Sequence, residues 1–112
     1  MKQVFDVPER GDVVWLALSP RDGPGPSARR PAVVLSPQAY NARVGLAIVC
    51  PIVSRVTGYP FEVPVPPGLP VAGVILADQA VSLDWRACRA ERICFLPSSA
   101  LEEALGKIRS LL

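Results

Sequence analysis

The sequence contains no histidine, which removes the side chain that most often serves as a catalytic base. Neither a Ser–His nor a Cys–His nucleophile pair can be built from this chain. There are only three cysteines, and no two of them have the CxxC spacing. Their odd number argues against a disulfide framework, and without histidine a zinc site would need an improbable set of ligands. We therefore expect no metal and no other cofactor.

Long apolar runs are also missing. No window approaches the roughly 18 consecutive apolar residues of a membrane-spanning helix, and residues 1–6 lack the apolar segment of a secretory signal. The sequence therefore predicts no membrane partner and a cytoplasmic location. With 112 residues, of which 50% are hydrophobic, the chain can bury a core, and we expect residues 1–112 to form a single domain.

Lysine is scarce among the basic residues: only two of the 12 are lysines, and the formal net charge is only +2. Between residues 21 and 60, however, five arginines stand against one acid, Asp22. The planar guanidinium suits recognition of phosphates and bases. A GC-rich genome would produce the same preference for arginine, so the bias alone does not establish a nucleic-acid partner.

Arg29 and Arg30 stand directly between a loop and a strand. Residues 19–31 hold four prolines and two glycines without any periodicity, which predicts a loop long enough to be functional. Pro31 restricts Arg30 to an extended backbone and opens the apolar run that follows. The two guanidiniums are thus placed at the mouth of a sheet, where they can bind a phosphate. The alternative is a loop that is basic by chance.

Short β-branched and apolar segments separated by Pro and Gly turns predict most of the fold. They lie at residues 11–18, 31–35, 46–53, 61–65, 73–83 (with a bend after 77) and 92–96. Pro64 confines its strand to an edge of the sheet. Pro37 opens a short helical turn through residues 38–41. Cys50 lies in an apolar run and is expected to be a small core residue.

The C-terminal segment has a helical period. Ser99 and Glu102 fit a capping box, and an apolar stripe of Leu101, Leu105, Ile108 and Leu112 follows, spaced to pack on a sheet. The whole pattern predicts a mainly β protein, a small curled antiparallel sheet or barrel with one C-terminal helix.

Several motifs, taken together and in order, resemble the MazF/PemK family of toxin endoribonucleases. They lie at residues 11–15, 30–37, 40–41, 58–63, 76–79 and 82–86. The resemblance implies a CcdB/MazF-type fold, an SH3-like, partly open antiparallel barrel that forms a symmetric homodimer. It also implies the toxin of a type II toxin–antitoxin system, which cleaves single-stranded RNA or mRNA at specific sequences without a metal and is neutralised by a cognate, MazE-like antitoxin.

Arg30 stands where this family keeps its catalytic arginine, and we expect it to stabilise the phosphate when the ribose 2′-OH attacks. Two positions depart from the family pattern. Gly25 replaces a loop glutamate, and Val53 replaces a hydroxyl residue at the end of the third strand. Ser54 is the substitute candidate for that hydroxyl, although neighbours along a strand face opposite sides of the sheet. Loss of a positioned acid or base typically slows catalysis about 10²–10⁴-fold.

The remaining candidates would bind RNA or move protons. The loop from Asp22 to Arg29 is expected to bind RNA, and Tyr59 and Trp15 offer faces for base stacking. For Trp15, burial in the core or in a dimer interface is the favoured alternative, and Trp85 is expected to be a packing residue. Asp78 and Glu62 are the fallback candidates for proton transfer, although a carboxylate that caps the backbone and a solvated strand face are the favoured roles for them. The expected RNA-binding residues are Arg29, Asn41, Tyr59, Asp78, Gln79 and Arg86, with Asn41 and Gln79 contacting base edges and Arg86 contacting phosphate.

Two other functions stay open at this point. Gly25 and Val53 fit a catalytically weak or inactive module that binds RNA or an antitoxin on the same scaffold. A gyrase-directed poison is the other, because the same barrel serves such a toxin family, although the motif at residues 30–37 argues against it. The antitoxin is expected to carry an acidic tail, because Arg29, Arg30 and Arg86 would otherwise present unopposed charge along the groove.

Overall fold

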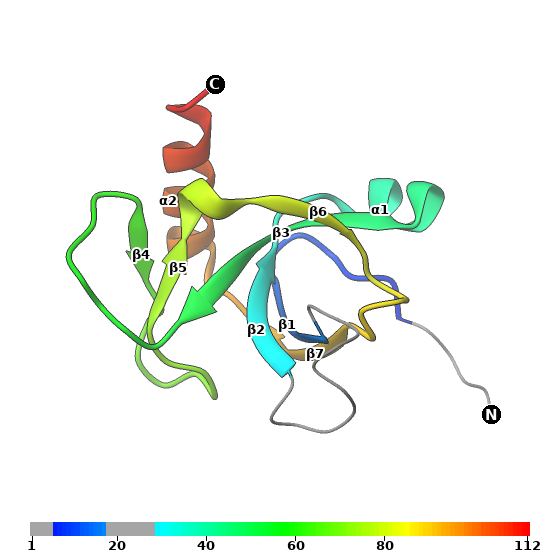
Figure 1. Ribbon diagram of the computed structural model, residues 1–112, viewed down its shortest axis with the longest axis horizontal. Helices are drawn as coiled ribbons and strands as arrows, with labels where there is room; N and C mark the ends of the chain where they lie inside the picture. The colour runs from blue at the N-terminus through cyan, green and yellow to red at the C-terminus, as the bar shows by residue number, and fades with distance from the viewer. Residues whose placement is uncertain (1–5, 18–28) are drawn as a thin grey trace.

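A computed structural model describes residues 6–17 and 29–112 of the chain. Seven strands, two α-helices and a 3₁₀ turn make up this part of the molecule (Figure 1). In chain order they are β1 (Asp12–Ala17), β2 (Arg29–Val34), α1 (Gln38–Val44), β3 (Leu46–Val53), β4 (Glu62–Pro64), β5 (Val74–Leu76), η3 (Ala77–Gln79), β6 (Val81–Asp84), β7 (Glu91–Phe95) and α2 (Ser98–Arg109).

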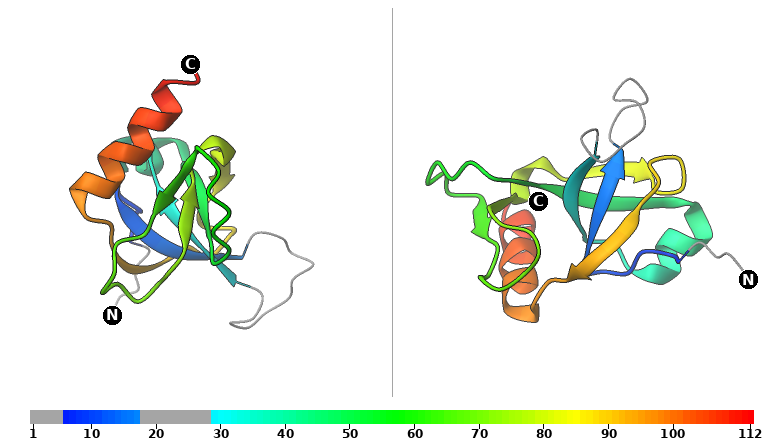
Figure 2. Two further views of the ribbon diagram at one scale, coloured as in Figure 1. Left: turned by 90° about the vertical axis from the view of Figure 1, so that its left-hand side faces the viewer. Right: turned by 90° about the horizontal axis from the view of Figure 1, so that it is seen from below.

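The strands form one antiparallel sheet in the order β4-β5-β3-β2-β1-β7. The long strand β3 pairs with β6 through its first half, with β2 in its middle and with β5 at its end. It therefore runs across the molecule, with β4, β5 and α2 at one end and α1 at the other (Figures 1 and 2). In the described chain the outer strands β4 and β7 do not pair with each other, so the barrel is partly open, as expected from the sequence.

Alternate residues of β1, β2 and β3 face two separate apolar clusters. Val13, Val33 and Cys50 pack with α2 on one face, where Ala100 and Ala104 are buried. The opposite cluster contains Val14, Leu16, Ala32, Val34, Val49 and Trp85. Cys50 and Trp85 are thus core residues, as predicted. Burial raises the pKa of the Cys50 thiol to about 12, so this cysteine is a packing group and not a nucleophile.

Several predictions about local structure are confirmed. The strand at 46–53 has the predicted bounds. Pro64 lies on the edge strand β4, where its missing N–H costs no ladder hydrogen bond. Leu101, Leu105 and Ile108 pack against the core, as the apolar stripe predicted.

Other predictions about local structure are wrong. The capping box is absent, because α2 begins after Pro97 and no side chain caps its first turn. Leu112 lies beyond the end of α2 and is 96% exposed, so it does not continue the stripe. The 3₁₀ turn η3 separates β5 from β6, where the sequence suggested one bent strand.

Two kinds of feature are absent from the described residues. No helix among them is both long and apolar enough to span a membrane. No group of three or more His, Cys, Asp or Glu side chains within residues 6–17 and 29–112 could hold a metal ion.

Candidate nucleic-acid site

Arg29 and Arg30 begin β2, where they pair across the sheet with Ala17 and Leu16 of β1. The Arg29 guanidinium forms an ion pair with Glu91 of β7. The predicted unopposed charge of Arg29 is therefore wrong. Arg30 is exposed, and its Nη1 donates to the Arg29 carbonyl at 3.1 Å.

The start of β2 extends past its pairing with β3. The two strands pair from Ala32 and Pro51 to Val34 and Val49, and their other ends diverge in Figure 1. Paired residues of neighbouring strands share a face, so Arg30 and Val53 belong to the same face of the sheet. Arg30 is thus exposed at the start of β2, where this strand has separated from β3.

A hollow of about 510 Å³ opens beyond the end of β3. We call it the Tyr59 hollow. It is lined by Val53, Arg55, Thr57, Tyr59, Glu62, Leu76, Asp78 and Gln79. Three of the predicted RNA-binding residues (Tyr59, Asp78 and Gln79) therefore meet at one place, although the sequence separates the first from the others by almost 20 residues.

Tyr59 and Asp78 hold each other across this hollow. The Tyr59 hydroxyl donates to Asp78 Oδ2 at 2.7 Å, and this hydrogen bond is the main reason why the pKa of Tyr59 is raised. The ring lies 5.9 Å from Phe61, centroid to centroid, yet Tyr59 is 48% exposed. A tethered, exposed aromatic ring is suited to stacking on a nucleobase.

Glu62 is committed to the backbone of the loop before it. Its Oε2 accepts the Thr57 hydroxyl at 2.6 Å, and its Oε1 accepts the Gly58 N–H at 3.0 Å. These donors, the hydroxyl first, lower the pKa of Glu62. The carboxylate therefore shapes the loop that carries Tyr59, which makes it a poor candidate for proton transfer.

Ser54 follows the last residue of β3 and is exposed. Because the strand ends at Val53, strict alternation of faces no longer fixes the direction of the Ser54 side chain. Val53 itself forms part of the hollow wall. Gly73 packs against this point with φ +125°, and a Cβ there would lie 2.0 Å from the Val53 carbonyl oxygen.

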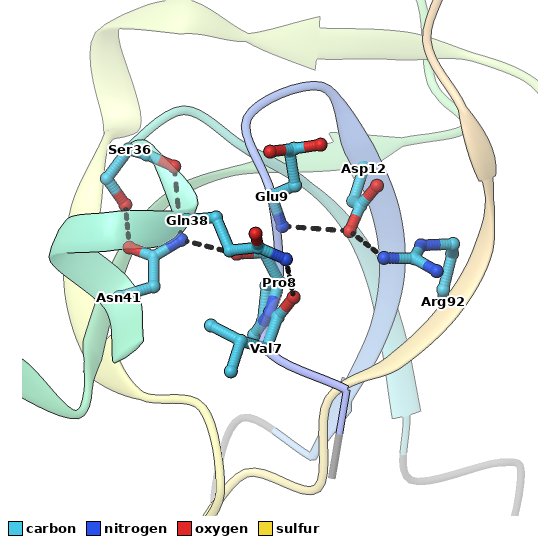
Figure 3. Close-up of polar contacts among 8 residues, drawn as sticks. All are labelled: Val7, Pro8, Glu9, Asp12, Ser36, Gln38, Asn41 and Arg92. Atoms are coloured by element: carbon cyan, nitrogen blue, oxygen red, sulfur yellow. Dashed lines mark hydrogen bonds and ion pairs between the residues drawn. The ribbon is translucent and has the colours of Figure 1, made fainter. Parts of the chain in front are cut away.

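Asn41 is fully buried and cannot contact a base, so this predicted role is wrong. Its amide donates to the carbonyls of Pro8 at 2.8 Å and Ser36 at 3.0 Å, and its Oδ1 accepts the Ser36 hydroxyl at 2.6 Å. Figure 3 shows Asn41 joining α1 to the N-terminal segment in this way. The amide thus has its hydrogen bonds satisfied inside the protein.

Arg86 lies apart from the Tyr59 hollow, in the turn between β6 and β7. Its guanidinium carbon is 4.8 Å from the centre of the Trp85 ring. It lines a second hollow, of about 310 Å³, together with Asp12 and Arg92.

Two further predictions concern Trp15 and the loop before β2. Trp15, the other candidate for stacking, is only partly buried in β1. Gly25 and most of the Asp22–Arg29 loop lie outside the described residues.

The sequence did not predict the ion pair between Asp12 and Arg92. Arg92 Nη2 lies 2.9 Å from Asp12 Oδ2, and the Asp12 side chain is only 1% exposed (Figure 3). The same oxygen accepts the Glu9 N–H at 2.9 Å. The Gly11-Asp12 pair marked a turn, and nothing in the sequence linked it to a residue 80 positions away.

Known proteins resemble this chain along nearly all of its length. The family model described as PemK-like, MazF-like toxin of type II toxin-antitoxin system matches residues 9–112. The chain is 40% identical over 106 residues to the endoribonuclease toxin MazF of Escherichia coli K12, with 95% of each covered. It is 35% identical over 109 residues to the endoribonuclease toxin ChpB of the same strain, with 92% of each covered.

Solved structures agree with this assignment. A chain of the crystal structure of MazE-MazF (Form-II) from Deinococcus radiodurans matches with a TM-score of 0.86 and 48% identity, covering 96% of both chains. MazF (Form-I) from the same organism matches with a TM-score of 0.85 and 49% identity, covering 96% of this chain and 97% of that one. The chain described here therefore belongs to the PemK-like, MazF-like family of toxins of type II toxin–antitoxin systems.

Proposed function

We propose that this chain is an endoribonuclease toxin that acts in the cytoplasm on single-stranded RNA or mRNA, at specific sequences and without a metal ion. Its Escherichia coli relatives MazF and ChpB are named endoribonuclease toxins. The structural observation that carries the proposal is the exposed Arg30 at the start of β2, with the Tyr59 hollow beyond the end of the neighbouring strand β3.

The proposed reaction is an attack of the ribose 2′-oxygen on the adjacent phosphorus. The 2′-OH loses its proton as the new O2′–P bond forms, the P–O5′ bond breaks, and the O5′ oxygen takes up a proton. The step leaves a cyclic phosphate and a 5′-hydroxyl with no net gain or loss of protons. Negative charge on the phosphoryl oxygens rises during this step. Arg30 binds and stabilises that charge, since a guanidinium can contact two phosphoryl oxygens at once.

Ser54 is the proposed hydroxyl partner of Arg30 for orienting the reacting phosphate. It is exposed directly after β3 and is not held in the strand. The two carboxylates of the Tyr59 hollow are already engaged, Glu62 with the Thr57–Gly58 backbone and Asp78 with the Tyr59 hydroxyl. We assign them to shaping the base-binding surface, on which the Tyr59 ring stacks a base and Gln79 contacts its edge.

The proposed partners are a second copy of this chain and a MazE-like antitoxin. Large apolar side chains gather near α1 and β6, where Tyr40, Val44, Ile48 and Val81 are between 37% and 50% exposed. An apolar patch of this kind favours burial against another chain. The solved Deinococcus relatives include complexes named MazE-MazF. An acidic antitoxin tail would oppose the exposed Arg30, together with Arg55 of the hollow.

The test is incubation of the purified protein with long unstructured RNA, with and without a chelator. The proposal predicts discrete fragments with 5′-hydroxyl ends in both conditions. Cleavage only with added metal, or no cleavage at all, contradicts it. Val53 in the wall of the hollow favours one alternative, a binding module, and that alternative predicts salt-dependent RNA binding with intact RNA.

A further inference from the structure

The second hollow, which we call the Arg86 hollow, has features that the proposed cleavage does not use. It has a volume of about 310 Å³ and lies between β1, β7 and the turn that joins β6 to β7. Three arginines line it, Arg86, Arg89 and Arg92, together with the acids Asp6, Asp12 and Glu91. Such a mixed lining is unfavourable for a purely anionic ligand and favourable for one that carries both an anion and hydrogen-bond donors.

The turn that carries Arg86 and Arg89 is held in an unfavourable conformation. Asp84 Oδ1 accepts the N–H groups of Arg86 at 3.0 Å and Ala87 at 2.9 Å, which fixes the start of the turn. Arg89 then adopts φ 55°, and it is the one non-glycine residue with positive φ in the part of the chain that the structure describes. Glycine or asparagine would suit this position better. An arginine held there despite the strain points to a use for its guanidinium.

Asp12 adds an acceptor that the fold leaves partly unused. Its Oδ2 is shared by Arg92 and the Glu9 N–H. Its Oδ1 is buried and has no hydrogen-bond partner within the described residues. A buried acceptor without a partner is costly, and a donor on a bound molecule would remove that cost. The Asp12–Arg92 ion pair therefore gives a partner to one oxygen of this carboxylate and leaves the other oxygen without one among the described residues.

A nucleotide with an amino-bearing base carries both an anionic phosphate and a hydrogen-bond donor, the two kinds of group that the lining of this hollow can bind. Guanidiniums bind its phosphate, and a carboxylate accepts hydrogen bonds from an exocyclic amino group, as Asp does with the N4 amino group of cytosine. We propose that the Arg86 hollow binds one nucleotide of the RNA substrate, outside the Tyr59 hollow, and prefers an amino-bearing base to uracil. This inference rests on the proposed function, because it takes RNA as the ligand.

The first experiment measures binding of short oligodeoxynucleotides, which lack the attacking 2′-OH and stay intact. Arg89→Gly removes a guanidinium and also relieves the strained φ, so the variant should melt at the same or a higher temperature. It should bind oligodeoxycytidine about tenfold more weakly. Arg109→Gln, at the exposed end of α2, removes the same charge and should weaken binding less than about twofold. Equal effects of the two variants would overturn the proposal.

The second experiment follows the indole N–H resonance of Trp85, which lines the hollow, during titration with single nucleotides. Cytidine monophosphate should shift this resonance at lower concentration than uridine monophosphate, and Asp12→Asn should abolish the difference. If Asp12→Asn does not fold, the same comparison is made with Arg89→Gly, which should weaken both titrations. An equal response to inorganic phosphate and to both nucleotides would overturn the base preference.

The two proposals fail separately. If the protein cleaves RNA and the variants Arg89→Gly and Arg109→Gln bind the oligonucleotide equally well, the proposed nucleotide site in the Arg86 hollow is wrong. The proposed endoribonuclease activity is then unaffected. If the protein does not cleave RNA but Arg89→Gly weakens oligonucleotide binding, the proposed endoribonuclease activity is wrong. The Arg86 hollow then remains a nucleotide-binding site.

Discussion

Gly73 lies so close to Val53 that their backbones leave no room for a side chain between them. A Cβ on Gly73 would lie 2.0 Å from the Val53 carbonyl oxygen, a backbone atom that cannot rotate away. The contact fixes the end of β3, where Ser54 and the wall of the Tyr59 hollow begin. This part of the proposed site therefore depends on a glycine that carries no chemistry itself.

Gly73→Ala should destabilise the protein by about 3 kcal/mol or more, since it combines a clash with backbone strain. Gly58→Ala is the matched control, because Gly58 also has positive φ (+82°) but has nothing within 4 Å of its would-be Cβ. It should cost only about 1–2 kcal/mol. Urea unfolding compares the two, and equal losses would show that the close contact with Val53 is unimportant.

The buried Asp12–Arg92 pair and the exposed Arg29–Glu91 pair should differ sharply in their effect on stability. Arg92→Gln leaves a carboxylate that is 1% exposed without its cation, and it should cost about 3 kcal/mol. Arg29→Gln breaks a pair whose Glu91 side chain is 65% exposed, and it should cost less than about 1 kcal/mol. Similar unfolding free energies for both variants would contradict the buried placement of Asp12.

The Tyr59–Asp78 hydrogen bond should be visible in the titration of the phenol. Because this bond raises the pKa of Tyr59, Asp78→Asn should lower it, and Tyr59→Phe identifies which of the two tyrosine transitions is affected. The raised pKa implies stability that is present below the unfolded pKa of tyrosine and is lost as pH rises through the folded pKa. An unchanged phenolate absorbance curve in Asp78→Asn would show that the bond is absent.

Glu62 should contribute to stability with the opposite pH dependence. Its folded pKa is lowered, chiefly by the Thr57 hydroxyl. Its contribution is therefore present above the unfolded pKa of glutamate and is lost as pH falls through the folded pKa. Glu62→Gln should reduce the difference between the free energies of unfolding measured at neutral and at acidic pH. Thr57→Val should produce part of the same effect, and a difference that both variants leave unchanged would contradict the assignment.

Local patterns along the chain predicted the strands well because their causes are local. Residues 46–53 are apolar, β-branched and bounded by glycine and serine, and they form β3 with those bounds. Pro64 was placed on an edge for a backbone reason that holds in any sheet. The order of motifs predicted the family, which the comparisons confirm.

The errors arise where a distant partner decides the outcome. Asn41 has the chemistry to contact a base, but the carbonyls of Pro8 and Ser36 satisfy its amide inside the protein. Arg29 was expected to be unopposed, and Glu91 opposes it from β7. Neither the Pro8 carbonyl nor Glu91 is marked by spacing, because each contact depends on how the chain folds. The capping box at Ser99 failed for a local reason instead, since α2 begins directly after Pro97.

The most direct test of the account is the cleavage rate of Arg30→Ala on RNA, measured beside its binding of an uncleavable deoxy analogue. Arg109→Ala is the control for loss of a positive charge. We predict that Arg30→Ala cleaves about 10²–10³-fold more slowly, with binding reduced far less, whereas the control is unaffected. Cleavage by Arg30→Ala at the rate of the unaltered protein would contradict the proposed role of this guanidinium.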